Sequence, residues 1–240
     1  MTSAAAELLA DGVPLGDLAD WSEWSLARVG FRPRNTLPVV GVCRDELMLP
    51  FEEAVQAAWG PAFDASSLAA LPLLGRTGIG AALGHTPGED GRNRFVVFSF
   101  PHLGVDAEGT PGLVLRPGIR HGTTACGALV AARARLASGD LDADTELDPD
   151  DVEMGLLLLA LHAEVGGGPV PDLVGLTEVL RRRAIGVLDR LVDGLHAAGT
   201  PVDHAMVSGI VVHGPHGADV AVVREAYVVI DRVRRDLPLG

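Results

Sequence analysis

Two cysteines and a histidine stand where an α/β protein could build a metal site. Cys43 ends an apolar run that begins at Leu37, and His102 follows a second apolar run, residues 95–100. Cys126 lies at the opening of a helical stretch, where the helix dipole would favour its thiolate. Thiolate and imidazole are preferred zinc ligands, and three protein ligands leave one position for water. If the three side chains meet, zinc would turn that water into a hydroxide nucleophile near neutral pH.

Charged residues near Cys43 could assist this chemistry. Asp45 could accept a hydrogen bond from the water and orient it, so we take Asp45 and its neighbour Arg44 as candidate catalytic residues. An arginine would be needed to keep Asp45 ionised or to neutralise an anionic product, and Arg44, Arg76 and Arg116 are the candidates.

The same residues allow two other interpretations. Free cysteines are among the most buried residue types, so both thiols could be apolar fillers and His102 a hydrogen-bonded core histidine. Alternatively, Cys126 could be the nucleophile of a cysteine hydrolase, with His102 or His121 as its base.

Other histidines could also take part. His85 and His121 are possible proton carriers, because imidazole titrates near neutral pH. His213 and His216 flank Gly214 and Pro215 and could form a second metal pair. The tip of a polar hairpin is the interpretation that we favour for this second pair.

Hydrophobic periodicity predicts alternating strands and helices. Strands are expected at residues 37–43, 95–100, 205–212 and 220–230, with the last two joined in a hairpin. Helices are expected at residues 15–29, 51–59, 125–138, 149–164 and 173–198. This alternation is typical of a mainly parallel sheet flanked by helices, an α/β fold. Ligands bind such sheets at the carboxyl ends of the strands, which is where Cys43 and His102 fall.

Local signals refine two of these segments. Thr123 or Thr124 should cap the helix at 125–138, and Gly139 should stop it. The glycine-rich segment 75–80 lacks the spacing of a nucleotide-binding loop. It indicates instead a close approach of the backbone to another segment or to a small ligand.

Charge and composition limit the partners. The formal net charge of −13 argues against nucleic acid or an anionic membrane as the main partner. All 19 basic residues are arginine, which excludes Schiff-base lysines, lysine-bound pyridoxal phosphate and a P-loop lysine. No signal peptide is visible and no apolar run is long enough to span a bilayer, so a cytoplasmic location is expected, with the cysteines as thiols or ligands.

Two exposed surfaces are also expected. Arg181, Arg182 and Arg183 occupy different faces of one helical turn and should lie on a solvated or subunit-facing surface. The helix at 15–29 carries Trp21 and Trp24 and could lie across a partner subunit.

Four segments together resemble, in order, segments of the limiting CO2-inducible protein B/C family, which is related to β-carbonic anhydrases. They are Val42-Cys43-Arg44-Asp45-Glu46-Leu47, Gly75-Arg76-Thr77-Gly78, Phe100-Pro101-His102-Leu103-Gly104-Val105 and Ala125-Cys126-Gly127-Ala128-Leu129. The resemblance covers roughly residues 37–130, and the C-terminal strands are compatible with it.

The resemblance implies a zinc enzyme of β-carbonic anhydrase-like fold that interconverts carbon dioxide and bicarbonate. It places the metal on Cys43, His102 and Cys126, and it implies a homodimer. It also implies a helical arm over residues 1–36 followed by a zinc-binding domain over residues 37–240. Because some members of the family lack the activity, an inactive zinc-containing homologue that binds or senses bicarbonate is the alternative.

The chain departs from the β-carbonic anhydrase pattern in two places. Leu47 stands where the Cys-x-Asp-x-Arg motif has arginine, so the partner of Asp45 must come from elsewhere. The short His-x-x-Cys pair is replaced by the long interval between His102 and Cys126, as in the B/C family. Asp45 could therefore orient the hydroxide or close the zinc as a fourth ligand.

Overall fold

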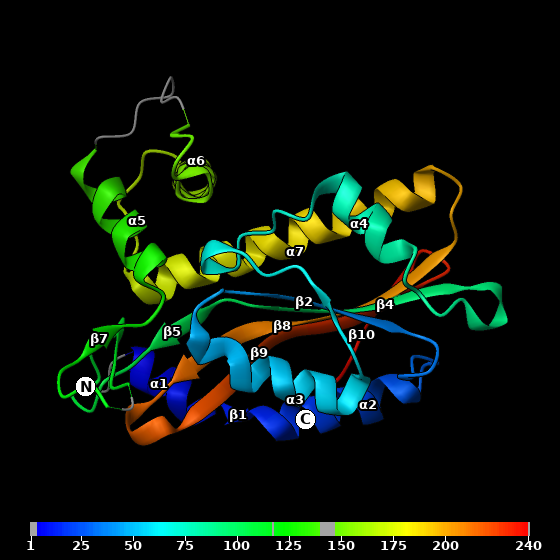
Figure 1. Ribbon diagram of the computed structural model, residues 1–240, viewed down its shortest axis with the longest axis horizontal. Helices are drawn as coiled ribbons and strands as arrows, with labels where there is room; N and C mark the ends of the chain where they lie inside the picture. Colours follow the sequence, from blue (N-terminus) through cyan, green and yellow to red (C-terminus); the bar gives the residue numbers. More distant parts are fainter. Residues whose placement is uncertain (1–3, 117, 140–146, 240) are drawn as a thin grey trace.

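A mixed sheet of eight strands forms the centre of the computed structural model, which describes residues 4–116, 118–139 and 147–239 (Figure 1). The strand order is β1-β9-β8-β4-β2-β3, with β10 beside β9 and β5 beside β8. The strands are β1 (Val13–Pro14), β2 (Leu37–Val42), β3 (Phe63–Asp64), β4 (Asn93–Phe100), β5 (His102–Gly104), β8 (Val202–His213), β9 (Asp219–Ile230) and β10 (Val233–Asp236). A separate two-stranded ribbon joins β6 (Leu113–Val114) to β7 (Thr123–Thr124).

The site-bearing half of the sheet is parallel. Strands β3, β2, β4, β8 and β5 pair in parallel, whereas β9 runs antiparallel to β8, β1 and β10. The predicted α/β fold with a mainly parallel sheet flanked by helices is confirmed, as is the hairpin formed by β8 and β9.

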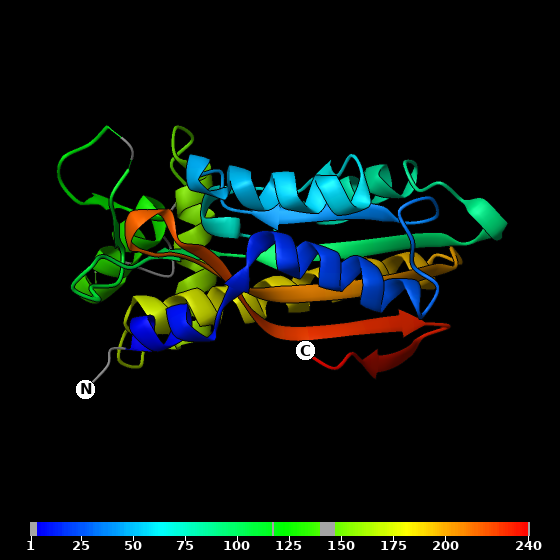
Figure 2. The ribbon, with the colours of Figure 1, turned by 90° about the horizontal axis from the view of Figure 1, so that it is seen from below.

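Helices cover both faces of the sheet. The helices are α1 (Ala4–Asp11), α2 (Leu15–Ala27), α3 (Leu49–Trp59), α4 (Gly75–Leu83), α5 (Gly127–Ser138), α6 (Val152–Val165) and α7 (Leu173–Ala197). Helices α1, α2 and α3 lie on one face, and α4 and α7 lie on the other (Figures 1 and 2). Helices α5 and α6 pack together beyond one end of α7. No helix in the described part of the chain is long and apolar enough to cross a membrane.

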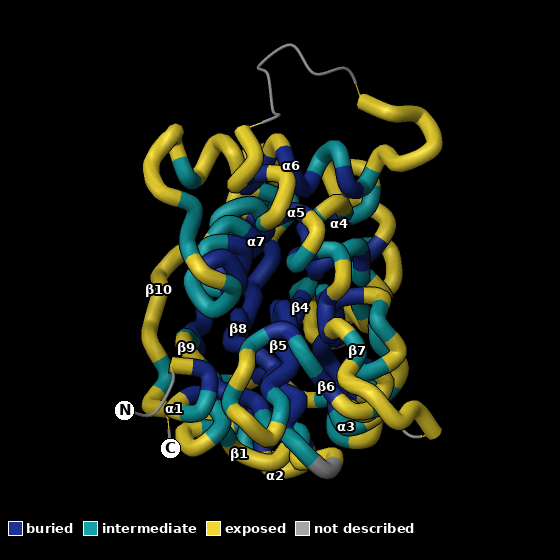
Figure 3. Tube along the Cα trace, turned by 90° about the vertical axis from the view of Figure 1, so that its left-hand side faces the viewer, coloured by how far each residue is buried: buried dark blue, intermediate teal, exposed yellow. Residues whose placement is uncertain are grey.

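Strand alternation explains the two layers of core. In β4, Phe95 and Val97 join a buried cluster with residues of α4 and α7. Phe98 and Phe100 point the other way and pack on Phe51 of α3. Because the sheet is covered on both faces, residues 95–98 of β4 are all apolar and almost fully buried (Figure 3).

Strand β8 is long enough to pair with two successive strands. The first half of β8 pairs with β4, and the second half pairs with β5. Pro101 lies between β4 and β5. A bulge between Ser208 and Gly209 marks the change, and a Cβ on Gly209 would lie 2.1 Å from the carbonyl oxygen of Val222. Glycine is therefore required at this position, where β8 bends towards the site.

The start of α5 differs from the prediction. The helix begins at Gly127, and Cys126 is its N-cap residue in the left-handed conformation, so Cys126 does not lie in the first turn. Thr123 and Thr124 do not cap the helix because they pair with β6. Gly139 ends the helix with φ +75°, as predicted.

Two other expectations were wrong. Residues 75–80 belong to helix α4. An added Cβ on Gly75 or Gly80 would meet nothing, and one on Gly78 would meet the side chain of Leu74 one turn earlier, so no other described segment approaches the backbone there. Arg181 is buried, with Glu178 and Glu225 neutralising its guanidinium, whereas Arg182 is exposed as expected.

The proposed division at residue 36 stays a prediction. Helix α2 packs against α3, and Leu18 and Leu26 of α2 belong to the same buried cluster as Phe51. Residues 140–150 are rich in aspartate and glutamate and are expected to form a solvated loop, of which residues 140–146 lie outside the described part of the chain.

Candidate metal centre

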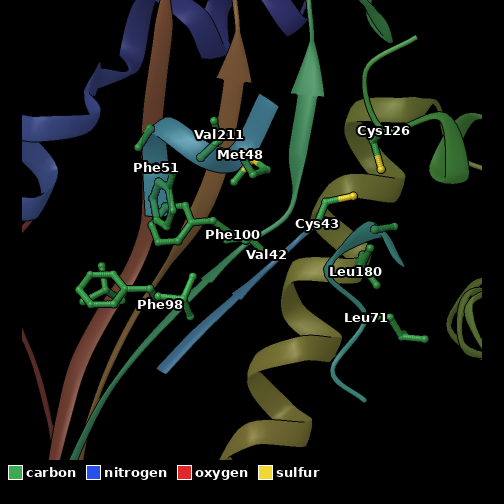
Figure 4. Close-up of a cluster of buried hydrophobic side chains, with 14 of the residues drawn as sticks. Val42, Cys43, Met48, Phe51, Leu71, Phe98, Phe100, Cys126, Leu180 and Val211 are labelled. Atoms are coloured by element: carbon green, nitrogen blue, oxygen red, sulfur yellow. The ribbon is translucent and has the colours of Figure 1, made fainter. Parts of the chain in front are cut away.

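The three predicted ligands meet at the carboxyl end of the parallel strands. Cys43 directly follows β2, His102 opens β5, and Cys126 precedes α5. One ligand atom from each lies within 4.8 Å of the other two, and all three residues are buried. Cys43 and Cys126 come from separate segments and direct their sulfur atoms towards the same region (Figure 4).

The unpaired ring nitrogen of His102 is suited to binding a metal ion. Its Nδ1 lies 3.0 Å from Nε2 of His213, whereas its buried Nε2 has no hydrogen-bond partner among the described residues. A buried polar atom without a partner is costly, and a metal ion at Nε2 would remove that cost. Two sulfurs and one imidazole nitrogen form a donor set that suits zinc.

The two thiols share one proton when no metal is bound to them. A hydrogen bond from Cys126 lowers the pKa of the Cys43 thiol to about 4, with further help from His102 and against the effect of burial. The same hydrogen bond raises the pKa of the Cys126 thiol, and so does its burial. The two thiols therefore titrate as a pair, in which one thiolate accepts a hydrogen bond from the remaining thiol.

Cys126 adopts a backbone conformation that is rare outside glycine. Its φ and ψ are 53° and 60°, which costs about 1–2 kcal/mol for a residue with a Cβ. In this conformation its backbone N–H donates to Asp45 Oδ2 at 3.3 Å. The strained residue is therefore one of the three candidate ligands, and its backbone also contacts Asp45.

Asp45 lies beside the three ligands without belonging to the group. Its Oδ2 is 3.9 Å from His102 Nε2, and its Oδ1 accepts a hydrogen bond from the Leu47 N–H at 3.2 Å. Burial alone would raise the pKa of Asp45, but the charge of His102, the Leu47 N–H and Arg116 together lower it. The carboxylate is thus held ionised.

Arg116 is the arginine that contacts Asp45. Its Nη2 donates to both carboxylate oxygens, at 3.0 and 3.1 Å, while its Nη1 donates to Thr123 Oγ1 and to the Thr124 carbonyl. Its Nε pairs with Glu46. One guanidinium therefore joins the segment after β6 to the segment after Cys43, and it supplies the partner that Leu47 cannot.

The other two candidate arginines lie elsewhere. Arg44, predicted as a catalytic residue, has a side chain that is 61% exposed and pairs with Glu153 of α6 at 2.8 Å. Arg76 lies in α4 and lines a surface groove with Arg190 of α7. Neither has a contact with Asp45 among the interactions of the described residues.

The structure adds a site residue that the sequence interpretation missed. His213 is not at a polar hairpin tip: it is the last residue of β8, is 1% exposed and contacts His102. Its sequence signal was available, because His213, like Cys43, ends an apolar strand. The side chain of His216 lies outside what the structure describes, and His85 and His121 are exposed.

Comparisons with known structures agree with the fold. The crystal structure of PtLCIB4, a homolog of the limiting CO2-inducible protein LCIB, superposes with a TM-score of 0.82 at 24% identity, covering 98% of this chain and 99% of that one. A histidine-to-alanine mutant of PtLCIB4 gives 0.81 at 25% identity over 95% and 94%. The crystal structure of LCIB itself gives 0.77 at 24% identity over 98% and 97%.

No curated protein matches the sequence. A family model does match, over residues 13–230, and it describes the limiting CO2-inducible proteins B/C, beta carbonic anhydrases. The chain therefore belongs to this β-carbonic anhydrase-like family and carries a Cys-His-Cys candidate metal site.

Proposed function

We propose that this protein is a zinc-dependent carbonic anhydrase that hydrates carbon dioxide reversibly to bicarbonate. The observation that carries the proposal is the buried Cys43, His102 and Cys126 group with the Asp45 carboxylate at its edge. Family membership supports it, because the family model is one of β-carbonic anhydrases.

In this proposal a zinc ion would activate a water molecule and the Asp45 carboxylate would orient it. Zinc held by the three ligands would supply Lewis acidity that makes a water molecule nucleophilic near neutral pH. Asp45 would accept a hydrogen bond from the O–H of that water and so aim an oxygen lone pair at the carbon of carbon dioxide. Arg116 and the Leu47 N–H would keep Asp45 an acceptor throughout the cycle.

The contacts of Asp45 favour an orienting role over a fourth-ligand role. Both of its oxygens accept from Arg116, and Oδ2 also accepts from the Cys126 N–H. To close the metal, Asp45 would have to weaken these bonds. An arginine in contact with Asp45 thus argues against the inactive bicarbonate-binding alternative.

The cysteine hydrolase hypothesis receives less support. Cys126 is 2% exposed, and burial together with the Cys43 hydrogen bond raises the pKa of its thiol. A nucleophilic cysteine needs the opposite environment.

The test is a stopped-flow assay of carbon dioxide hydration with zinc-loaded protein. We expect a rate far above that of buffer, and a loss of roughly 10–100-fold in both Asp45→Asn and Arg116→Gln. The first variant loses the carboxylate that accepts from the reacting water, and the second loses the cation that holds that carboxylate ionised. Arg44→Gln is the matched control and should retain most of the activity, since Arg44 pairs with Glu153 instead. A zinc-loaded protein with no rate above buffer would favour the binding homologue.

The homodimer and the cytoplasmic location are proposals that rest on the family and on composition. The exposed Trp24 of α2 stacks under Arg28 rather than in the core, which is compatible with a surface for a second subunit. Sedimentation at micromolar concentration tests the dimer, and a purely monomeric species would contradict it.

A further inference from the structure

A chain of buried polar groups continues behind the metal ligand His102. His102 Nδ1 lies 3.0 Å from His213 Nε2, and His213 Nδ1 lies 3.1 Å from Asp219 Oδ1. Both imidazoles are at most 1% exposed, and their rings stand nearly perpendicular, with centroids 5.1 Å apart. The chain thus runs from a carboxylate through two imidazoles to the unpartnered Nε2.

The strand register fixes all three residues. His213 pairs with Asp219 across the β8–β9 hairpin, and it pairs with Gly104 across the parallel β5–β8 ladder. His102, two residues before Gly104, therefore projects on the same side of the ladder as His213. A Cβ on Gly104 would lie 2.6 Å from both Ala125 Cβ and the Leu113 carbonyl oxygen, so glycine is required here.

We propose that His213, polarised by Asp219, is a positioning residue that sets the tautomer and ring orientation of His102 for metal binding. The inference deepens the proposed function because it rests on the same metal site, but it does not depend on the reaction. His213 contacts neither substrate nor metal in this scheme.

The proton positions follow from the partners. The Asp219 carboxylate lies within ion-pair distance of His213 Nδ1, but the two groups are not aligned for a hydrogen bond. The carboxylate therefore acts mainly through its negative charge, which favours the tautomer of His213 with its proton on Nδ1. His213 Nε2 is then an acceptor, and His102 must carry its own proton on Nδ1 to donate. This leaves the lone pair of His102 on Nε2, the atom that faces the thiols.

A matched residue in the same strand separates positioning from packing. His204 is also in β8, is 2% exposed and lies 3.3 Å from the carboxylate of Asp189. It does not belong to the cluster of candidate metal ligands among the described residues. Replacing either histidine by phenylalanine removes a buried imidazole beside a carboxylate, but only one of the two changes should reach the metal.

The first experiment measures zinc affinity by competition with a chromophoric chelator. We expect His213→Phe to bind zinc roughly 10–100-fold more weakly than the parent, as for other outer-shell partners of metal ligands. Asp219→Asn should have a smaller effect in the same direction, and His213→Gln, which can still accept, should recover part of the loss. His204→Phe should bind zinc like the parent even if it melts at a lower temperature.

The second experiment reads the tautomers directly. Long-range 1H–15N spectra of the histidine-labelled protein should place the proton of both His102 and His213 on Nδ1. A proton on Nε2 of His213, or parental zinc affinity in His213→Phe, would overturn the inference, and so would a parent that binds no zinc. A parent that binds zinc but hydrates no carbon dioxide would defeat the proposed reaction and leave the positioning role intact.

Discussion

Two buried imidazole–carboxylate pairs lie towards opposite ends of β8, and they differ in what surrounds them. Towards one end, His213 lies between Asp219 and His102. Towards the other end, His204 lies 3.3 Å from Asp189. Both histidines are almost fully buried, so burial and a carboxylate neighbour do not by themselves distinguish a functional pair from a structural one.

The His204 end is an anchor. The Tyr227 hydroxyl donates to both oxygens of Asp189, at 2.6 and 2.7 Å, and so ties α7 to β9. Burial would raise the pKa of Asp189, but hydrogen bonds from His204 and Tyr227 lower it, while burial and Asp189 raise the pKa of Tyr227. The carboxylate is therefore satisfied within the protein.

The difference lies in what faces the free ring nitrogen. A buried nitrogen without a partner occurs at both ends, in His204 and in His102. Only His102 is faced by two thiols, and among the described residues its group alone gathers three candidate ligands. A donor set that converges on one point is thus a better sign of a metal site than an unpaired atom alone.

The largest expected effect is the loss of zinc when a candidate ligand is removed, compared with removal of the histidine at the other end of β8. His102→Ala should lower zinc affinity by more than about 100-fold, because a ligand matters more than its outer-shell partner. His204→Ala should leave one zinc per chain after dialysis. Elemental analysis of both variants provides the measurement, and equal zinc loss in the two would contradict the assignment.

A substitution at Gly104, next to the candidate ligands, should lower the stability of the protein through steric overlap. We expect Gly104→Ala to destabilise the protein by about 1–3 kcal/mol, because its Cβ would overlap Ala125 and the Leu113 carbonyl. Gly80→Ala in the exposed part of α4 is the control and should stabilise the protein by about 0.5–1 kcal/mol. Urea unfolding measures both, and equal free energies of unfolding would count against the close packing at Gly104.

The anchor can be weakened without touching the metal. Tyr227→Phe removes a donor from the Asp189 carboxylate and should cost about 1–3 kcal/mol of folding free energy. Zinc affinity should stay at the parental value. A variant of parental stability would show that water replaces the phenol and that the anchor is weak.

The last prediction concerns the pH dependence of zinc affinity at the two thiols. Cys43, with its pKa lowered to about 4, is already a thiolate at neutral pH, whereas Cys126 keeps its proton because its pKa is raised. Zinc must displace that one proton, so its affinity should fall about tenfold for each unit of pH decrease. Competition titrations between about pH 6 and pH 8 measure the slope. A slope of zero, or of two protons, would refute the one-proton pair.

Sequence periodicity predicted most of the fold. Apolar runs of strand length located β2, β4, β8 and β9, and their alternation with helices predicted the mainly parallel sheet. Segments whose structure depends on pairing with another short strand were predicted less well. Thr123 and Thr124 are good capping residues, yet the β6 strand pairs with them and the helix starts later.

The ligands were predictable and their support was not. Cys43 and His102 each follow an apolar run, Cys126 lies at the start of a predicted helix, and the family resemblance supported the set of three. Arg116 was one of three candidates, since nothing local shows that β6 brings it to Asp45. His213 was interpreted as part of a turn because glycine and proline follow it, and its burial depends on β5, a strand of three residues.

The scattering of the ligands along the chain has a consequence for biogenesis. Cys43, His102 and Cys126 lie close together only when β2, β4 and β5 are in register with one another and with β8. No short peptide of this protein holds a complete coordination set, unlike a zinc finger, which the ion itself folds. Loading with metal should therefore come last in maturation, and uptake of the ion would report that the sheet has already assembled.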